Sequence, residues 1–148
     1  MNPAQIEKAK IFQALHQRPG AFLFPNPWDG GSARLLEQLG FPALATSSGA
    51  SAATLGRRDG KLNRTEALAH ARAIVQATAL PVAADLENGF ADTPAEVAET
   101  IRLAAEAGLV GGSIEDATGD KSRPQYELSE AVERVAAAVA AARALPFP

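Results

Sequence analysis

Two carboxylates follow an apolar run at the centre of the chain. Asp85 and Glu87 come directly after residues 80–84 (Leu-Pro-Val-Ala-Ala) and directly before Asn88-Gly89. A proline followed by small and β-branched residues favours a short buried strand, and Asn-Gly is typical of a turn. Because residues two apart on a strand point to the same side, we expect both carboxylates to project together. Two unpaired acids repel each other, so a divalent cation would relieve the repulsion.

A second strand-like run, residues 109–114, also ends in acids, Glu115 and Asp116. Two strands that both carry acids at their carboxyl ends predict one acidic rim on one sheet. Mg²⁺ takes oxygen ligands, keeps several waters and uses few protein carboxylates, so Asp85, Glu87 and Glu115 are candidate ligands for Mg²⁺, with Mn²⁺ as the alternative. The other interpretation is that these acids are simply solvated, or cap the helices that follow.

Other candidates follow the earlier predicted strands. Asp59 could join the same site, or could be a turn residue before the glycine that follows it. The small residues Ser47, Ser48 and Gly49 offer backbone N–H groups that could hold a carboxylate or oxyanion, although small residues also simply form tight loops. Trp28 could line the pocket or pack against the end of the fold. His16 and His70 fall within predicted helices and are expected at the surface, not as ligands.

Strands alternate with helices along the whole chain, which predicts a parallel α/β sheet in a single domain, residues 1–148. No Gly-rich dinucleotide fingerprint is present, so a TIM-type (β/α) barrel is favoured over an open doubly wound sheet. A full barrel needs eight units and about 250 residues, so we expect about half a barrel, with four parallel strands and an N-terminal helix. The expected strands are 21–24, 41–47, 81–85 and 109–114; the expected helices are 3–17, 32–39, 63–77, 93–107 and 129–144.

Composition excludes several classes of function. The net charge is −3 and the basic residues are scattered, so the electrostatic footprint of a nucleic-acid-binding protein is missing. The chain has no cysteine, which excludes disulfides, thiolate metal sites and a cysteine nucleophile within it. The polar N-terminus does not read as a signal peptide, and the most apolar tract, residues 135–142, is too short to cross a membrane. We therefore expect a cytoplasmic protein with no membrane partner.

Four segments together resemble the isocitrate lyase/phosphoenolpyruvate mutase superfamily, in the same order and spacing over essentially the whole chain. The resemblance implies a Mg²⁺-dependent barrel enzyme that acts on a small 2-oxo or 2-hydroxy acid. Members break or form C–C or P–C bonds beside a carboxylate, through an enolate-like intermediate or a phosphoryl transfer. The segments are Pro25-Asn-Pro-Trp-Asp-Gly-Gly-Ser-Ala-Arg-Leu35, Ser47-Ser-Gly with Leu55-Gly-Arg-Arg-Asp59, Pro81-Val-Ala-Ala-Asp-Leu-Glu-Asn-Gly-Phe90 and Gly112-Ser-Ile-Glu-Asp116.

The resemblance also assigns roles by position. Asp85, Glu87 and Glu115 match the metal-site acids of the family, and Asp59 matches a further catalytic acid near metal and substrate. The N–H groups of Ser48 and Gly49 match those that bind the substrate carboxylate, with Ser47 beside them. These implied roles agree with a metal acting as Lewis acid and with fixed donors holding a carboxylate.

Three departures from the family pattern narrow the expected reaction. Glu87 stands where the family commonly has Asp, and Gly89-Phe90-Ala91 replaces Gly-Tyr/Phe-Gly. The loop 117–126 lacks the Lys-Lys/Arg-Cys-Gly-His signature of the true lyases. Isocitrate or methylisocitrate cleavage is therefore not expected, and Lys121, or Arg123, is the candidate acid in a gating loop.

The chain stops where a fifth strand of the family would begin, at Leu145-Pro-Phe-Pro148. The first functional hypothesis is a lyase, mutase or hydrolase acting on a small carboxylate. The alternative is a catalytically incomplete fragment that only binds metal or self-associates, because two half-barrels could pair as a homo-oligomer and cover their sheet edges. A third reading is an unrelated α/β binding domain.

Overall fold

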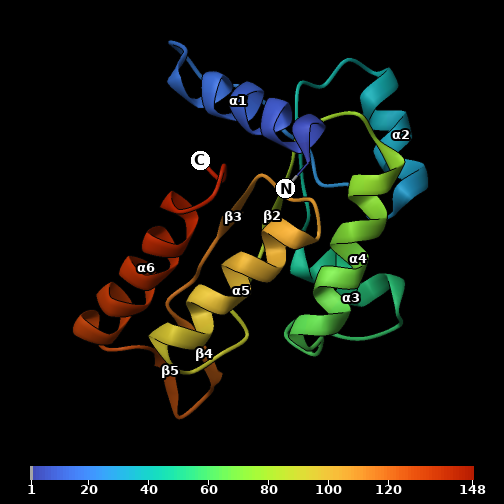
Figure 1. Cartoon of the computed structure of the whole chain (residues 1–148). Helices are drawn as coiled ribbons and strands as arrows, with labels where there is room; N and C mark the ends of the chain where they lie inside the picture. Colours follow the sequence, from blue (N-terminus) through green and yellow to red (C-terminus); the bar gives the residue numbers. More distant parts are fainter. Residues whose placement is uncertain (1) are drawn as a thin grey trace.

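A computed structural model describes residues 2–148 and shows an α/β fold around a parallel sheet (Figure 1). The sheet has three strands in the order β1-β2-β3, each beside the next along the chain. Leu44 pairs with Val82, and Ala83 pairs with Gly111. The predicted parallel α/β sheet is thus confirmed. The strands are β1 (Leu44–Ala45), β2 (Val82–Asp85) and β3 (Gly111–Ser113).

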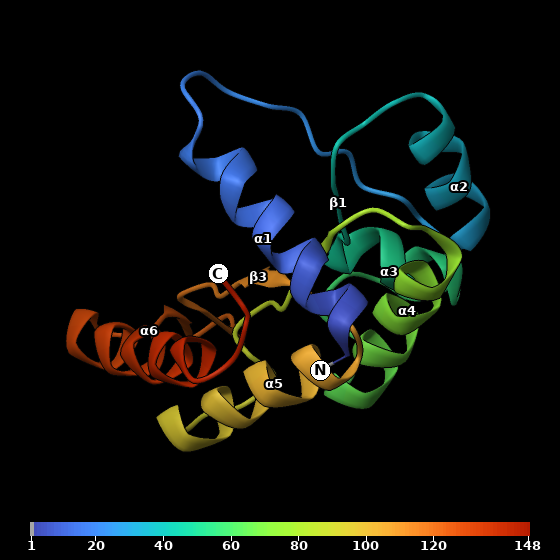
Figure 2. The same ribbon diagram turned by 45° about the horizontal axis from the view of Figure 1, so that its top comes forward.

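In the part of the chain that the structure describes, six helices pack around this sheet. Figures 1 and 2 show α4, α5 and α6 arranged in that order around one side of the sheet, while α1 lies across the other. Capping boxes form at Asn63–Glu66 and Thr93–Glu96 and begin α4 and α5, at the helix starts expected from the sequence. Among residues 2–148, no helix combines the length and apolar character needed to cross a membrane. The helices are α1 (Pro3–Gln17), α2 (Gly30–Gln38), α3 (Ser48–Thr54), α4 (Arg64–Ala77), α5 (Pro94–Glu106) and α6 (Leu128–Arg143).

The sheet buries apolar side chains on both faces, as expected when successive strand residues point in opposite directions. Val82 and Ala84 belong to the larger core, which they share with the helices of the outer side. Ala83, between them, belongs to a smaller core with Phe12 of α1. Gly111 makes this second contact possible, because a Cβ there would lie 2.6 Å from the Phe12 ring. The sheet therefore has an outer face covered by helices and an inner face covered in part by α1.

The segment 21–24, predicted as the first strand, is not a strand. The next residue, Pro25, accepts a backbone hydrogen bond from Ala45 of β1 (3.1 Å). Pro25 and Pro27 have no N–H to donate, so a regular ladder cannot continue here. Phe22 and Phe24 instead stack on each other, with ring centroids 5.2 Å apart.

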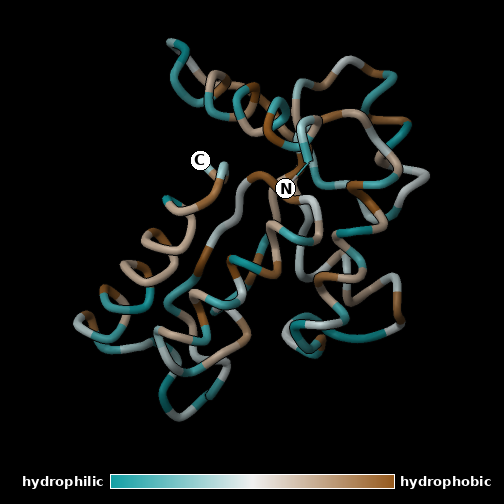
Figure 3. Tube along the Cα trace, in the orientation of Figure 1, coloured by the Kyte–Doolittle hydropathy of each residue, from teal (hydrophilic) through white to brown (hydrophobic). Residues whose placement is uncertain are grey.

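Three further segments differ from expectation. The predicted strand 41–47 is reduced to β1, and the small-residue loop after it is the start of α3, capped by the Ser47 side chain. The polar loop after Asp116 is a hairpin of β4 (Ala117–Asp120) and β5 (Arg123–Gln125). Figure 3 shows that this hairpin is mostly hydrophilic, which explains why no apolar alternation reveals it in the sequence. Residues 145–148 form no strand.

Gly108 connects α5 to β3 and is expected to be intolerant of a side chain. Its φ is +98°, and a Cβ would lie 2.7 Å from Cγ1 of Val75. Gly40, which follows α2, has a similar φ of +84° and no atom within 4 Å of its Cβ position. Gly108→Ala should therefore cost about 2–5 kcal/mol of unfolding free energy, from left-handed strain plus overpacking, against about 1–2 kcal/mol for Gly40→Ala. Urea unfolding of both variants measures this difference, and equal losses would show that the Val75 contact is unimportant.

Candidate functional site

Four carboxylates converge at the carboxyl end of the sheet, from three regions of the chain. Asp59 lies in the loop after α3, Asp85 ends β2, Glu87 lies in the turn after β2, and Glu115 follows β3. Burial first, and then Asp59, Asp85 and Glu115, raise the pKa of Glu87 to about 7. Burial, and then Asp85, Asp59 and Asp116, also raise the pKa of Glu115. These mutual effects mean that the candidate acids share one electrostatic environment.

Two cavities meet at these acids. One, of about 490 Å³, opens between α3, the turn after β2 and the β4–β5 hairpin, and Glu115 is shared with a second cavity of about 660 Å³ on the inner face of the sheet. Asp85 lines the second cavity and not the first. The first cavity, called the acid cavity below, is lined by Ser48, Asp59, Gly60, Leu62, Asn63, Arg64, Glu87, Asn88, Phe90, Glu115, Ala117, Thr118 and Gly119.

The Asp85 carboxylate is held by backbone donors. Its Oδ2 accepts a hydrogen bond from the Ser48 N–H (2.9 Å), and its Oδ1 accepts one from the Glu87 N–H (3.0 Å). The Asp85 N–H in turn donates to Oγ1 of Thr46 (3.2 Å). One of the two N–H groups predicted to bind a substrate carboxylate, that of Ser48, is therefore directed at Asp85.

The first turn of α3 also lies against Asp59. A Cβ on Gly49 would be 3.7 Å from Cγ of Asp59, which is an ordinary van der Waals distance, so Gly49 lies directly beside this carboxylate. Ser47 lies beside them and caps the helix, because its Oγ accepts a hydrogen bond from the Ala50 N–H (3.3 Å). The structure therefore brings the small-residue segment and the acids together.

Glu87 lies in a turn after β2, and not on the strand itself as predicted. The strand ends at Asp85, and Leu86 turns its side chain into the core with 1% exposure. Glu87 then adopts φ +48°, a left-handed conformation that is uncommon for a residue with a side chain. The expectation that Asp85 and Glu87 project from one face of a strand is therefore wrong, because a turn, not strand alternation, brings these two carboxylates together.

The donor set suits a hard cation. Among residues 2–148, none of the four ion pairs involves Asp59, Asp85, Glu87 or Glu115, so their charge is not neutralised by a basic side chain. In the side-chain arrangement of the same residues, no group of three or more His, Asp or Glu side chains is close enough to enclose an ion directly. Carboxylate oxygens that act partly through water are the ligand type Mg²⁺ prefers, so the residues present fit such an ion chemically.

Trp28 and Lys121 do not line the acid cavity. Trp28 is 55% exposed, and its carbonyl oxygen accepts a hydrogen bond from Nε2 of His70 (2.7 Å). Nδ1 of His70 is 2.8 Å from Oγ of Ser51, so this histidine is not the free surface residue expected from sequence. Lys121 is exposed at the tip of the β4–β5 hairpin.

Asn88 and Thr118 line the acid cavity but do not stand out in the sequence. Asn88 belongs to an Asn-Gly pair, which indicates a turn, and nothing in that signal shows where its amide points. Thr118 lies in the hairpin that the sequence does not reveal. For both residues, tertiary placement alone indicates a functional position.

The chain matches known proteins along most of its length. The family model described as phosphoenolpyruvate phosphomutase matches residues 12–148. A 2,3-dimethylmalate lyase from Eubacterium barkeri is 39% identical over 94 residues, which is 62% of this chain and 32% of that protein. This chain spans about half the length, or less, of the relatives it matches.

Solved structures share the same fold. A Burkholderia cenocepacia protein, provisionally described as a lyase/mutase, has a TM-score of 0.96 and 59% identity, covering 99% of this chain and 52% of that one. A phosphoenolpyruvate phosphomutase from Streptomyces platensis subsp. rosaceus has a TM-score of 0.83 and 30% identity, covering 94% of this chain and 51% of that one. The parallel sheet is thus part of a barrel-type fold, and the chain belongs to the phosphoenolpyruvate phosphomutase family, within the isocitrate lyase/phosphoenolpyruvate mutase superfamily.

Proposed function

We propose that this chain carries the divalent-cation site of a lyase or mutase that acts on a small 2-oxo or 2-hydroxy carboxylate. The convergence of Asp59, Asp85, Glu87 and Glu115 at the strand ends carries the proposal, because burial, together with repulsion from the other three acids, raises the pKa of Glu87 to about 7. A bound cation removes such repulsion. Family membership supports the same conclusion, since related proteins are named as lyases and mutases.

Each residue has a defined part in this proposal. Asp85, Glu87 and Glu115 would hold Mg²⁺ or Mn²⁺, and Asp59 lies across the acid cavity as a further acid near the substrate. Bound there, the cation would supply a Lewis acid that polarises the oxygen of the substrate next to its carboxylate. The N–H of Gly49 remains the proposed donor to that carboxylate, with Ser47 beside it, and the N–H of Ser48 would join if Asp85 turned toward the cation.

The bond broken in the proposed reaction is C–C or P–C, as the resemblance implies. The hairpin 117–126 contains no cysteine, so a cysteine of this loop is not the acid in the proposed mechanism. Lys121 would act only if the hairpin folded over the acid cavity, since its side chain is exposed at the hairpin tip. Trp28 would likewise contact substrate only at the outer rim of the site.

Binding of Mg²⁺ should stabilise the folded chain. A ligand at 100 times its Kd that binds only the folded state adds about 2.7 kcal/mol. We expect Mg²⁺ with oxalate to raise the melting temperature of the wild-type chain, and Glu115→Gln to abolish most of the rise. Glu99→Gln is the matched control, because Glu99 is an exposed acid paired with Arg102 on the surface of α5. An equal shift in all three proteins would contradict the assigned site.

The metal-free chain should lose stability as the pH rises, because of Glu87. Its pKa is about 7 in the folded chain against an ordinary 4.5, so the folded state binds the proton more tightly. The contribution of protonated Glu87 to the unfolding free energy is therefore fully present below pH 4.5, and it is lost as the pH rises to about 7. In EDTA, Glu87→Gln should gain unfolding free energy relative to wild type between pH 5 and pH 8, as measured by urea unfolding at both pH values. Parallel pH profiles for the two proteins would show that Glu87 is not strained by its neighbours.

A second proposal is that the chain self-associates as a homo-oligomer. Within residues 2–148, β3 pairs only with β2, which leaves one edge of β3 without a partner strand. The inner-face cavity next to it is largely apolar in its lining, with Phe12, Phe24, Ala45 and Ala83. An unpaired edge beside an apolar surface favours pairing with another chain.

Sedimentation over a wide concentration range tests this second proposal. We expect reversible association, which Ser113→Lys should weaken, since a lysine on an edge strand opposes pairing. Ser122→Lys, an equal change of charge at the exposed hairpin tip, should have no effect. A monomer at every concentration would contradict self-association without affecting the cation site.

A further inference from the structure

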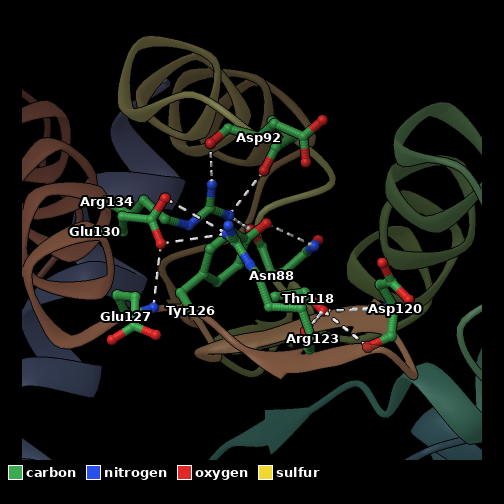
Figure 4. Close-up of polar contacts among 10 residues, drawn as sticks. Asn88, Asp92, Thr118, Asp120, Arg123, Tyr126, Glu127, Glu130 and Arg134 are labelled. Atoms are coloured by element: carbon green, nitrogen blue, oxygen red, sulfur yellow. Dashed lines mark hydrogen bonds and ion pairs between the residues drawn. The ribbon is translucent and has the colours of Figure 1, made fainter.

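Arg134 of α6 is a buried cation with no acidic partner. It is 2% exposed, and none of the ion pairs within residues 2–148 includes it. Its guanidinium instead donates hydrogen bonds to the backbone carbonyl oxygens of Asn88, Ala91 (2.7 Å) and Asp92 (Figure 4). A buried charge is costly unless it is well hydrogen-bonded. The three carbonyl oxygens therefore stabilise the buried guanidinium.

The segment that Arg134 holds is the turn that follows β2, residues 86–92. Glu87 and Phe90 both have positive φ, at +48° and +53°. Residues with side chains remain in this conformation only where the surrounding structure fixes them. Thr100 of α5 contributes one further anchor, because its Oγ1 donates to the Gly89 carbonyl oxygen (2.6 Å). Arg134 supplies further anchors on both sides of that bond, and the Glu87 carbonyl oxygen accepts one more hydrogen bond, from the Glu115 N–H (2.8 Å).

Arg134 also contacts the end of the β4–β5 hairpin. The Tyr126 ring centroid lies 3.9 Å from Cζ of Arg134, within the range of a cation–π interaction. Oη of Tyr126 accepts a hydrogen bond from Nδ2 of Asn88 (3.4 Å). Figure 4 shows the three side chains converging between the turn and the hairpin. Both segments line the acid cavity, so one arginine connects its two walls.

We propose that Arg134 is a positioning residue that holds residues 86–92 in the strained turn, and so directs the Glu87 carboxylate at the acid cavity and keeps the Asn88 amide against Tyr126. The consequence for cation binding rests on the function proposed above. The planar fork of arginine suits several convergent acceptors, whereas lysine offers one compact charge. Nε of Arg134 is buried without a hydrogen-bond partner among the described residues. The guanidinium therefore makes its hydrogen bonds to the three carbonyl oxygens at the cost of leaving one N–H donor unpaired.

Arg134→Met tests the proposal, because it keeps an apolar stem and removes every donor. Amide exchange of residues 87–92 and 117–126 should become about tenfold faster or more, while β2 and the middle of α5 keep their protection. The Kd for Mg²⁺, measured by calorimetry below the melting temperature, should rise about 10–100-fold, as for other groups that orient metal ligands. Compared with Arg134→Met, Arg134→Lys should show slower amide exchange at these residues and a lower Kd for Mg²⁺.

Arg102→Met is the matched control, since Arg102 lies on the surface of α5 and pairs only with Glu99. It should change neither exchange nor Mg²⁺ binding. If Arg134→Met is too unstable to study, Arg134→Lys alone should still show faster exchange at residues 87–92. Unchanged local exchange in a folded Arg134 variant, or loss of protection spread evenly over the chain, would overturn the positioning role. A wild-type chain that binds no Mg²⁺ would contradict the proposed function, while the exchange comparison would still decide the role of Arg134.

Discussion

Repulsion among carboxylates at the carboxyl end of the sheet is the constraint on which this structure depends. Asp59, Glu115 and the neighbouring pair Asp85 and Glu87 come from three regions of the chain, and each must be held near the others against their common charge. Burial, and then their proximity to one another, raises the pKa of Glu87 and of Glu115. Such a cluster would separate in a flexible chain, so its persistence requires rigid support from the elements behind it.

That support comes from the packing around the sheet. The backbone N–H groups of Ser48 and Glu87 hold the Asp85 carboxylate, while Thr100 and Arg134 hold the turn that carries Glu87. Thr100 of α5 and Arg134 of α6 belong to the helices on the outer side, whose apolar faces form the larger core, whereas Ser48 begins α3. The strained turn, residues 86–92, is thus supported by α5 and α6. The acid cavity lies between this turn, α3 and the β4–β5 hairpin.

The inner face of the sheet is built differently. Phe12 of α1 covers Ala83 and Gly111, and a cavity of about 660 Å³ extends from this contact to Asp85 and Glu115. In the solved relatives, a chain about twice as long contains this part of the fold. Within residues 2–148, this inner face and the unpaired edge of β3 are the surfaces on which the self-association proposed above would occur.

Much of the fold was predictable from local signals. Caps at Asn63 and Thr93, with Gly108 after α5, mark helix ends because they act on the backbone within a few residues. The apolar runs before Asp85 and Glu115 mark β2 and β3 in the same way. The prediction of a strand at residues 21–24 was wrong. Strand-like residues form a hydrogen-bonded ladder only when a partner strand and backbone N–H donors are both present.

The sequence by itself determined the parallel α/β sheet and the acids that follow its strands, because periodicity, capping and residue type are local properties. Only the tertiary structure decided how those acids meet. It replaced strand alternation between Asp85 and Glu87 with a left-handed turn, and it engaged the Ser48 N–H with Asp85. It also brought Arg134, far along the chain, against the carbonyls of that turn. Contacts between residues more than 40 positions apart depend on how helices pack on the sheet, and no local pattern in the sequence records them.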